Sequence, residues 1–177
     1  MTEQISINPV PDASIENKRM SILLRDVTPD DEPFLFEVYA STRNQELEGL
    51  GWGEKQKQDF IRMQFATRER SFPRVEDRIV LSDGRSIGRL AVDRTEKAIW
   101  LRDIALLTEY RNAGIGSGLI KDLMHEAAVC GKPLMLHVLF ISQAVRLYER
   151  LGFSTTGSDA GYLEMTWLPP SSITSEE

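Results

Sequence analysis

Cysteine and histidine are scarce in this sequence. Cys130 is the one cysteine, and His125 and His137 are the only histidines among 177 residues. A lone cysteine excludes an internal disulfide framework and favours a reducing compartment. So few thiol and imidazole groups also argue against a structural zinc site, and we expect a protein without a bound metal.

Long apolar runs are missing as well. No stretch of the sequence approaches the roughly 20 apolar residues that a membrane-spanning helix requires. Residues 1–20 are polar and lack the apolar core of a signal peptide. We therefore expect a cytoplasmic protein that does not enter a membrane.

Basic charge is in deficit. The chain has 21 Lys and Arg residues against 27 Asp and Glu residues, which gives a formal net charge of -6 at pH 7. Because nucleic-acid binding depends on basic patches, this balance argues against a nucleic-acid partner. Hydrophobic residues make up 41% of the chain, which is enough apolar material for a core.

Turn signals and apolar periodicity predict one domain, residues 21–168, between two polar tails, residues 1–20 and 169–177. A first helix is expected to begin at Asp30 or Asp31, with Phe34, Phe36, Val38 and Tyr39 as its apolar residues. Three more helices are expected at 55–68, with Met63 on its apolar side, at 114–129 and at 142–151. Strands are expected at 22–25, 78–81, 87–92, 98–107, 133–139 and 162–167, with an Asp83-Gly84 hairpin turn. This order predicts an α/β or α+β fold, with a mixed, partly antiparallel central sheet flanked by helices.

A cluster of small residues joins a predicted strand to a predicted helix. Arg111-Asn112-Ala113-Gly114-Ile115-Gly116 follows the strand that ends at Leu107. Small residues leave backbone N–H groups uncovered there, the helix dipole favours an anion, and Arg111 adds a forked donor. The turn therefore predicts a pyrophosphate site, and a purely structural turn is the alternative.

Two common phosphate-binding loops do not match this turn. A Walker loop would need Gly-Lys-Ser or Gly-Lys-Thr, but Gly118 is followed by Leu119-Ile120. A dinucleotide fingerprint needs the spacing Gly-x-Gly-x-x-Gly, whereas the glycines here stand at positions 114, 116 and 118. A nucleotide-binding module is therefore a weak third hypothesis.

A second segment lies about thirty residues downstream, where Ala144 to Phe153 reads Ala-x-x-Leu-Tyr-x-x-x-Gly-Phe. Together with Arg-x-x-Gly-x-Gly from Arg111, this ordered pair resembles the GNAT N-acetyltransferase superfamily. The resemblance covers roughly Ile22 to Trp167 and is strongest from Asp103 to Phe153. It implies a GNAT-like acyl-CoA N-acyltransferase fold with acetyl-CoA as cosubstrate.

The resemblance also implies roles for individual residues. A splayed strand would offer its backbone to the pantetheine arm and to the thioester carbonyl. Tyr148 would lie near the CoA sulfur and protonate the leaving thiolate, because a phenol is neutral at pH 7; a tyrosine packed in the core is the alternative. The strand residues are Ile104, Ala105 and Leu106, and the pyrophosphate would be held by the backbone of Arg111, Asn112, Ala113, Gly114, Ile115, Gly116 and Ser117.

The usual general base of the family is absent. Many members have a glutamate about eleven residues before the Arg111 position, and Trp100 stands there. Asp103 is the nearest carboxylate and is the candidate, although strand alternation puts it on the opposite face from Trp100 unless a bulge intervenes. A structural role for Asp103 stays open, and Glu46 and Glu48 could line an acceptor pocket or be solvated.

A family asparagine is replaced as well. Ile141 and Ser142 stand in its place, and Ser142 can cap the following helix and supply part of a hydrogen bond to CoA. Cys130, at a helix C-terminus where the dipole disfavours a thiolate, is expected to be a small buried residue. His125 and His137 are expected to be structural, and direct attack within a ternary complex is favoured.

These residues predict an N-acetyltransferase that acts on a primary amine of a small molecule or peptide. The alternative is a non-catalytic acyl-CoA-binding protein with a sensor or regulatory role, motivated by the missing glutamate and asparagine. The sequence selects neither the acceptor nor the oligomeric state, so a homodimer stays open. Arg102 is expected in a surface ion pair.

Overall fold

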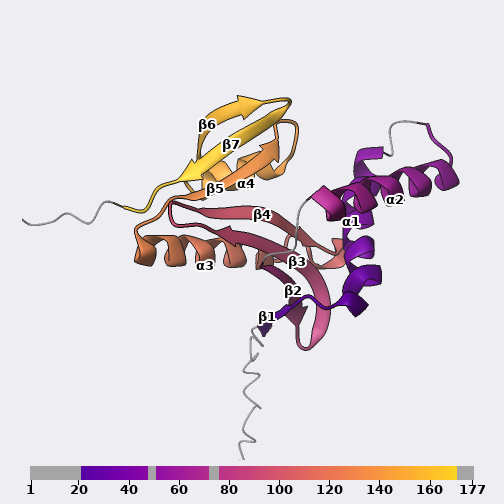
Figure 1. Cartoon of the computed structure of the whole chain (residues 1–177), viewed down its shortest axis with the longest axis horizontal. Helices are drawn as coiled ribbons and strands as arrows, with labels where there is room; N and C mark the ends of the chain where they lie inside the picture. Colours follow the sequence, from indigo (N-terminus) through magenta and orange to yellow (C-terminus); the bar gives the residue numbers. More distant parts are fainter. Residues whose placement is uncertain (1–20, 48–50, 72–75, 171–177) are drawn as a thin grey trace, which may run out of the picture.

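A computed structural model describes residues 21–47, 51–71 and 76–170. Seven strands form one sheet in the order β1-β2-β3-β4-β5-β7-β6, flanked by helices (Figure 1). Neighbouring strands are antiparallel except for β4 and β5, which are parallel. The strands are β1 (Ile22–Asp26), β2 (Asp77–Ser82), β3 (Arg85–Arg94), β4 (Ile99–Leu106), β5 (Leu134–Leu139), β6 (Ser154–Asp159) and β7 (Tyr162–Trp167). The helices are α1 (Glu32–Leu47), α2 (Glu54–Ser71), α3 (Ile115–Cys130) and α4 (Ala144–Arg150), with short 3-10 turns η1 (Pro29–Asp31) and η3 (Thr108–Tyr110).

The mixed sheet confirms the predicted α+β fold. The β2–β3 turn has positive φ angles of 48° at Asp83 and 79° at Gly84, which is the left-handed turn that Asp-Gly predicts. Strand β7 has the predicted limits, and the other predicted elements end within three residues of their predicted limits.

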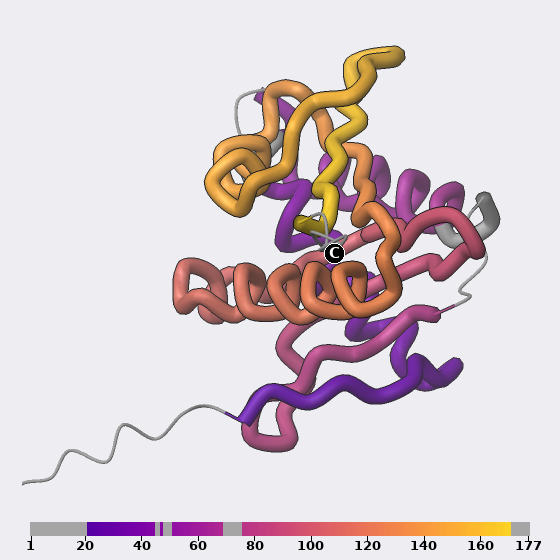
Figure 2. Tube along the Cα trace, turned by 90° about the vertical axis from the view of Figure 1, so that its left-hand side faces the viewer, coloured from indigo at the N-terminus to yellow at the C-terminus, as the bar shows by residue number. Residues whose placement is uncertain are grey.

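Helices cover both faces of the sheet (Figures 1 and 2). On one face, α1 and α2 pack against β2 through a cluster that includes Leu35, Ile61 and Ile79. On the other face, α3 packs against the central strands. Four apolar residues of α3 at helical spacing are all buried on this face, namely Ile115, Leu119, Leu123 and Ala127.

The start of α1 is fixed by one carboxylate. Asp31, in η1, accepts hydrogen bonds from the Thr28 N–H at 2.8 Å and from the Arg25 guanidinium at 2.6 and 2.7 Å. The hydrogen bonds from Arg25 are the main reason why the pKa of Asp31 lies well below its usual value. Asp31 therefore acts near the predicted helix start, where it ties β1 to α1.

Three sequence predictions fail in detail. Strand β6 was not predicted, because Ser154–Asp159 is a polar edge strand without apolar alternation. Met63 was expected on the apolar side of its helix but is 59% exposed. Cys130 was expected to be buried but is exposed at the last turn of α3, where the helix face turns to solvent.

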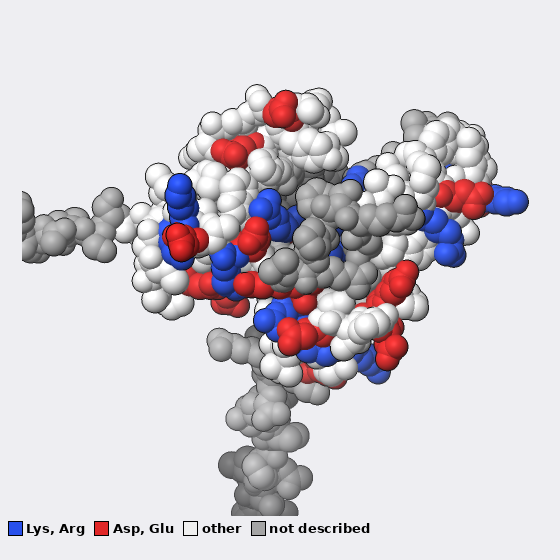
Figure 3. Space-filling model, in the orientation of Figure 1, with Lys and Arg blue, Asp and Glu red and all other residues white. Residues whose placement is uncertain are grey.

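The surface carries charge of both signs. Figure 3 shows acidic and basic side chains interspersed on the face that it presents, rather than gathered by sign. Within the described ranges, no helix is both long and apolar enough to cross a membrane.

Candidate functional site

Strands β4 and β5 are paired over only a short part of their length. Ile99, Trp100 and Leu101 pair with Leu134–Leu136, but β4 continues to Leu106 and β5 to Leu139. Figure 1 shows the two strands diverging beyond their paired ends. The sheet is therefore splayed at its centre, as the family resemblance implied.

The register shows which backbone groups of β4 face this opening. The Leu107 N–H donates to Ile87 O at 2.9 Å, which fixes the phase of the β3–β4 ladder. Residues of an antiparallel strand alternate between facing their partner and facing away. Ala105 therefore directs its backbone groups toward β3, whereas Ile104 and Leu106 direct theirs toward β5. Two of the three predicted strand residues thus offer backbone groups to an extended ligand, and Ala105 does not.

The glycine-rich turn presents the N-terminus of α3. Asn112 and Gly114 have positive φ angles of 61° and 81°, and Gly114 is the N-cap without a side-chain capping bond. The first turn of α3 also has no acidic residue. Because the first N–H groups of a helix have no intrahelical partner, the turn from Gly114 to Ser117 leaves donors directed outward. This is the arrangement that an anion requires.

Arg111 holds this turn in place. Its Nε donates to the Leu106 carbonyl at 2.8 Å, and its Nη2 donates to Ser41 Oγ of α1 at 2.9 Å. The backbone N–H of Arg111 donates to Thr108 O at 3.2 Å. The forked donor that the sequence suggested for phosphate therefore binds the protein itself, joining the turn to β4 and α1. Leu106 is left with its N–H, and not its carbonyl, for a ligand.

Gly88 of β3 is paired with Leu106 in this part of β4. A Cβ at this position would overlap the Ala105 carbonyl oxygen and would lie 2.6 Å from Leu106 Cδ2. We predict that Gly88→Ala lowers the free energy of unfolding by about 2 kcal/mol, because β4 has to move. The same displacement should weaken acetyl-CoA binding. Urea unfolding and calorimetric titration measure the two effects.

Gly157→Ala is the matched control for this prediction. Gly157 also lies in a strand, but a Cβ there would make only ordinary contacts, at 3.6 Å from the Glu164 Cβ. This variant should unfold within about 0.5 kcal/mol of the wild type. Equal effects of the two substitutions would contradict the role given to Gly88.

Tyr148 lies in α4 and is only 7% exposed. Its ring meets Phe153 edge-on, with 5.6 Å between the ring centroids. Burial, and secondarily the charge of Asp103, raise the pKa of Tyr148 to about 12. The phenol is therefore neutral at physiological pH and is a hydrogen-bond donor. Just before the same helix, Ser142 Oγ accepts a hydrogen bond from the Ala144 N–H at 3.2 Å, although the N-cap itself is Gln143, which forms no side-chain capping bond.

A β-bulge reverses the expected orientation of Asp103. Ala91 pairs with Asp103 and Val92 pairs with Leu101, so Arg102 is an extra residue in β4. Asp103 consequently faces the same side of the sheet as Trp100. Its carboxylate lies 2.8 Å from an Arg68 Nη2 and 3.8 Å from Arg89 Nε.

The alternation of side chains along a regular strand could not have revealed this bulge.

The other acceptor-site candidates, the Glu46 side chain and Glu48, lie outside the described residues. Arg102 forms the expected ion pair, with 2.8 Å between its Nη2 and Asp93 Oδ2.

A histidine that the sequence assigned to structure lies beside Trp100. The two rings of Trp100 and His137 are 5.2 Å apart and inclined by 30°. His137 Nε2 lies 3.5 Å from Glu164 Oε2. No local pattern could have found this group, because the pairing of β4, β5 and β7 brings its members together.

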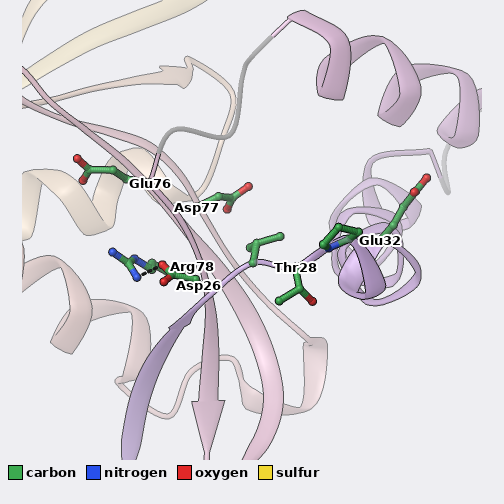
Figure 4. A pocket seen from close by; sticks show the side chains of 8 residues that line it. Asp26, Thr28, Glu32, Glu76, Asp77 and Arg78 are labelled. Atoms are coloured by element: carbon green, nitrogen blue, oxygen red, sulfur yellow. Dashed lines mark hydrogen bonds and ion pairs between the residues drawn. The ribbon is translucent and has the colours of Figure 1, made fainter.

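An open hollow of about 680 Å³ lies elsewhere, beside β1, η1 and β2 (Figure 4). Three of its carboxylates are ion-paired, and Figure 4 shows the contact of Arg78 with Asp26. The remaining pairs are Glu76 with Arg94 and Asp77 with Arg89. Among the described residues, no group of three or more His, Cys, Asp or Glu side chains could hold a metal ion.

Comparisons with known proteins bear on this geometry. Residues 75–155 match the family described as "Acetyltransferase (GNAT) domain". No curated protein sequence is significantly similar to the chain.

Many solved structures share the fold. The PaiA N-acetyltransferase from Thermoplasma acidophilum, in complex with coenzyme A, is 20% identical with a TM-score of 0.65, over 84% of this chain and 99% of that one. The ribosomal-protein-S18-alanine N-acetyltransferase from Escherichia coli is 19% identical with a TM-score of 0.57, over 87% and 98%. An acetyltransferase from Thermus thermophilus is 19% identical with a TM-score of 0.60, over 84% and 97%.

Proposed function

Residues 75–155 place this chain in the GNAT acetyltransferase superfamily, and we propose that it transfers the acetyl group of acetyl-CoA to a primary amine. The observation that supports this most is the splay of β4 from β5 beside the uncapped N-terminus of α3. An extended thioester cofactor with a pyrophosphate needs both features, and they are adjacent here. A Cβ at Gly116 would lie 4.0 Å from Ile104 Cδ1, which shows how close the turn is to the open strand edge.

The open edge of β4 suits the pantetheine arm. The Ile104 C=O and the Leu106 N–H would form hydrogen bonds with this arm that they do not form with β5. The N–H groups of Ile115, Gly116 and Ser117 would receive the pyrophosphate, with the positive end of the α3 dipole behind them. Ser142 would supply the polar contact that the family obtains from asparagine.

Acetyl transfer follows from this placement. The amine attacks as a neutral nucleophile, a C–N bond forms, and the C–S bond of the thioester breaks. The Ile104 N–H would stabilise the negative charge that develops on the thioester oxygen. Tyr148 would donate its hydrogen to the leaving sulfur. The acceptor enters as an ammonium and loses one proton to solvent before it attacks. The second proton, lost by the nitrogen after the attack, returns to the Tyr148 oxygen, so the thiol keeps the hydrogen that Tyr148 gave.

The test begins with acetyl-CoA binding to the purified protein, measured by calorimetric titration. The protein is then incubated with acetyl-CoA and a panel of amines, namely amino acids, polyamines and peptides with free N-termini or lysines. We expect saturable binding, release of the CoA thiol, and an acetylated amine detected by mass. Binding without release with any amine would indicate a non-catalytic acyl-CoA-binding protein. A folded protein that does not bind acetyl-CoA would overturn the proposal.

A further inference from the structure

The acceptor amine must lose a proton, and the expected carboxylate is poorly suited to take it. Asp103 is 23% exposed, and the guanidinium groups of Arg68 and Arg89 lie against its carboxylate. The Arg68 guanidinium, at 2.8 Å, engages a lone pair that a base would use. Trp100, which occupies the position of the family glutamate, has no basic group.

His137 lies beside Trp100, which stands at the position where the family has its glutamate. It is the first residue of β5 beyond the last pair with β4, that of Leu101 with Leu136, so it lies where the two strands begin to diverge. Its ring lies against Trp100, and its side chain is 49% exposed. A basic nitrogen is therefore accessible at the apex of the splay, on the face of the sheet that Trp100 shares with Asp103.

Glu164 orients this imidazole. It is the partner of His137 in the β5–β7 register, and its Oε2 lies 3.5 Å from Nε2 of the ring. Its other oxygen, Oε1, accepts a hydrogen bond from Thr156 Oγ1 at 2.9 Å, so the carboxylate is held in place. A carboxylate beside Nε2 favours the hydrogen on that nitrogen and leaves the lone pair on Nδ1. Catalytic hydrogen bonds are often longer without substrate, which suits the 3.5 Å separation.

The other charged and titratable groups near His137 either form ion pairs with other residues or lie further from the imidazole. The guanidinium of Arg102, on β4, lies over the ring of Trp100 rather than over His137, 5.0 Å from the Trp100 ring centroid. Arg102 is also ion-paired with Asp93 of β3. Tyr162, two residues from Glu164 on β7, pairs with Leu139 rather than with His137. Glu164 is therefore the carboxylate that faces the imidazole directly.

We propose that Nδ1 of His137, positioned by Glu164, accepts the proton of the acceptor ammonium and makes the amine nucleophilic. This rests on the proposed acetyl transfer. The N–H bond of the ammonium breaks, its electron pair stays on nitrogen, and the proton passes through His137 to water. His137 is the catalytic residue of this step and Glu164 a positioning residue.

The test compares His137→Gln with His125→Gln, which removes the exposed histidine of α3, the helix that packs against the other face of the sheet. The pH dependence of kcat and of kcat/KM for the amine is measured for both, with acetyl-CoA binding measured by calorimetry. We expect His137→Gln to lower kcat at pH 7 by about 100-fold. It should also remove the acidic limb of the profile, because the imidazole no longer titrates. Acetyl-CoA binding by this variant, and all parameters of His125→Gln, should stay as in the wild type.

Glu164→Gln separates positioning from structure. Loss of the carboxylate should lower kcat and leave the KM for the amine and acetyl-CoA binding unchanged, because the ring is no longer held in the orientation that proton transfer needs. A purely structural role would instead change stability or KM and leave kcat in place. A wild-type enzyme that transfers acetyl groups, with His137→Gln retaining its rate and acidic limb, would overturn the role of His137 alone. No transfer by the wild type to any amine would overturn both proposals.

Discussion

Gly116→Glu is expected to abolish acetyl-CoA binding and at the same time to stabilise the protein. Gly116 lies in the first turn of α3, which has no acidic residue and no side-chain cap. A glutamate there gains helix propensity and a favourable interaction with the helix dipole, about 1 kcal/mol in total. The same carboxylate would occupy and repel the site of the pyrophosphate. Loss of two charge-assisted hydrogen bonds should weaken acetyl-CoA binding at least about 100-fold.

The opposite signs of the two effects make this prediction specific. Thermal unfolding should show a higher Tm while calorimetric titration shows no binding, so a folding defect cannot explain the loss. Gly118→Ala, two residues further along in an exposed and unobstructed position, should stabilise α3 and keep binding. Ala128→Glu adds the same charge at the other end of α3 and should also keep binding. Full binding by Gly116→Glu would place the pyrophosphate elsewhere.

Tyr148→Phe is expected to lower kcat by about 100-fold without changing acetyl-CoA binding. The variant keeps the ring that packs against Phe153 and removes only the hydroxyl that we assign to the leaving sulfur. Tyr110→Phe is the control, because Tyr110 is partly buried against the same core cluster. Steady-state rates with a reactive amine, together with calorimetry, measure the two effects. An unchanged kcat in Tyr148→Phe would leave the tyrosine as a core residue.

The raised pKa of Tyr148 adds a stability test. Its pKa is about 12 when the protein is folded and 10.0 when the phenol is solvated. Between these values the unfolded chain has lost the proton and the folded chain keeps it, so stability falls as pH rises. The wild type should therefore lose up to about 3 kcal/mol more than Tyr148→Phe between pH 10 and pH 12. Parallel pH dependences of the two proteins would contradict the burial of this phenol.

Much of the fold could be predicted because it is encoded locally. The Asp83-Gly84 turn and the spacing of the α3 residues act over a few positions, and both are as expected. Strand β6 escaped prediction because it forms only by pairing with β7, and its polar residues carry no apolar pattern. Pairing with a neighbour supplies what its own sequence does not.

The candidate site likewise contains features that a local sequence pattern predicts and features that depend on distant segments. The turn at Gly114 was predicted from a motif that lies within one segment, and the splayed strand at Ile104 was predicted from the family resemblance that this motif and the downstream segment carry together. The face of Asp103 depends on one unpaired residue, Arg102, whose presence in a bulge is decided by β3. His137 was set aside because its partners are contributed by two other strands. Contacts between segments far apart in the sequence have no local signature, so these could not have been predicted.

The short junction between β4 and β5 also has a mechanical consequence. Three residue pairs join the four-stranded half of the sheet to the three-stranded half, and the helix α3 spans the connection. Such a joint is weaker than the ladders on either side of it, so the two halves can open against each other before either one unfolds. A cosubstrate lying in the splay would act as a temporary strand and lock the halves together. Binding of the cosubstrate would then make the sheet more rigid at the same time, and release of the product would restore the weaker connection between β4 and β5.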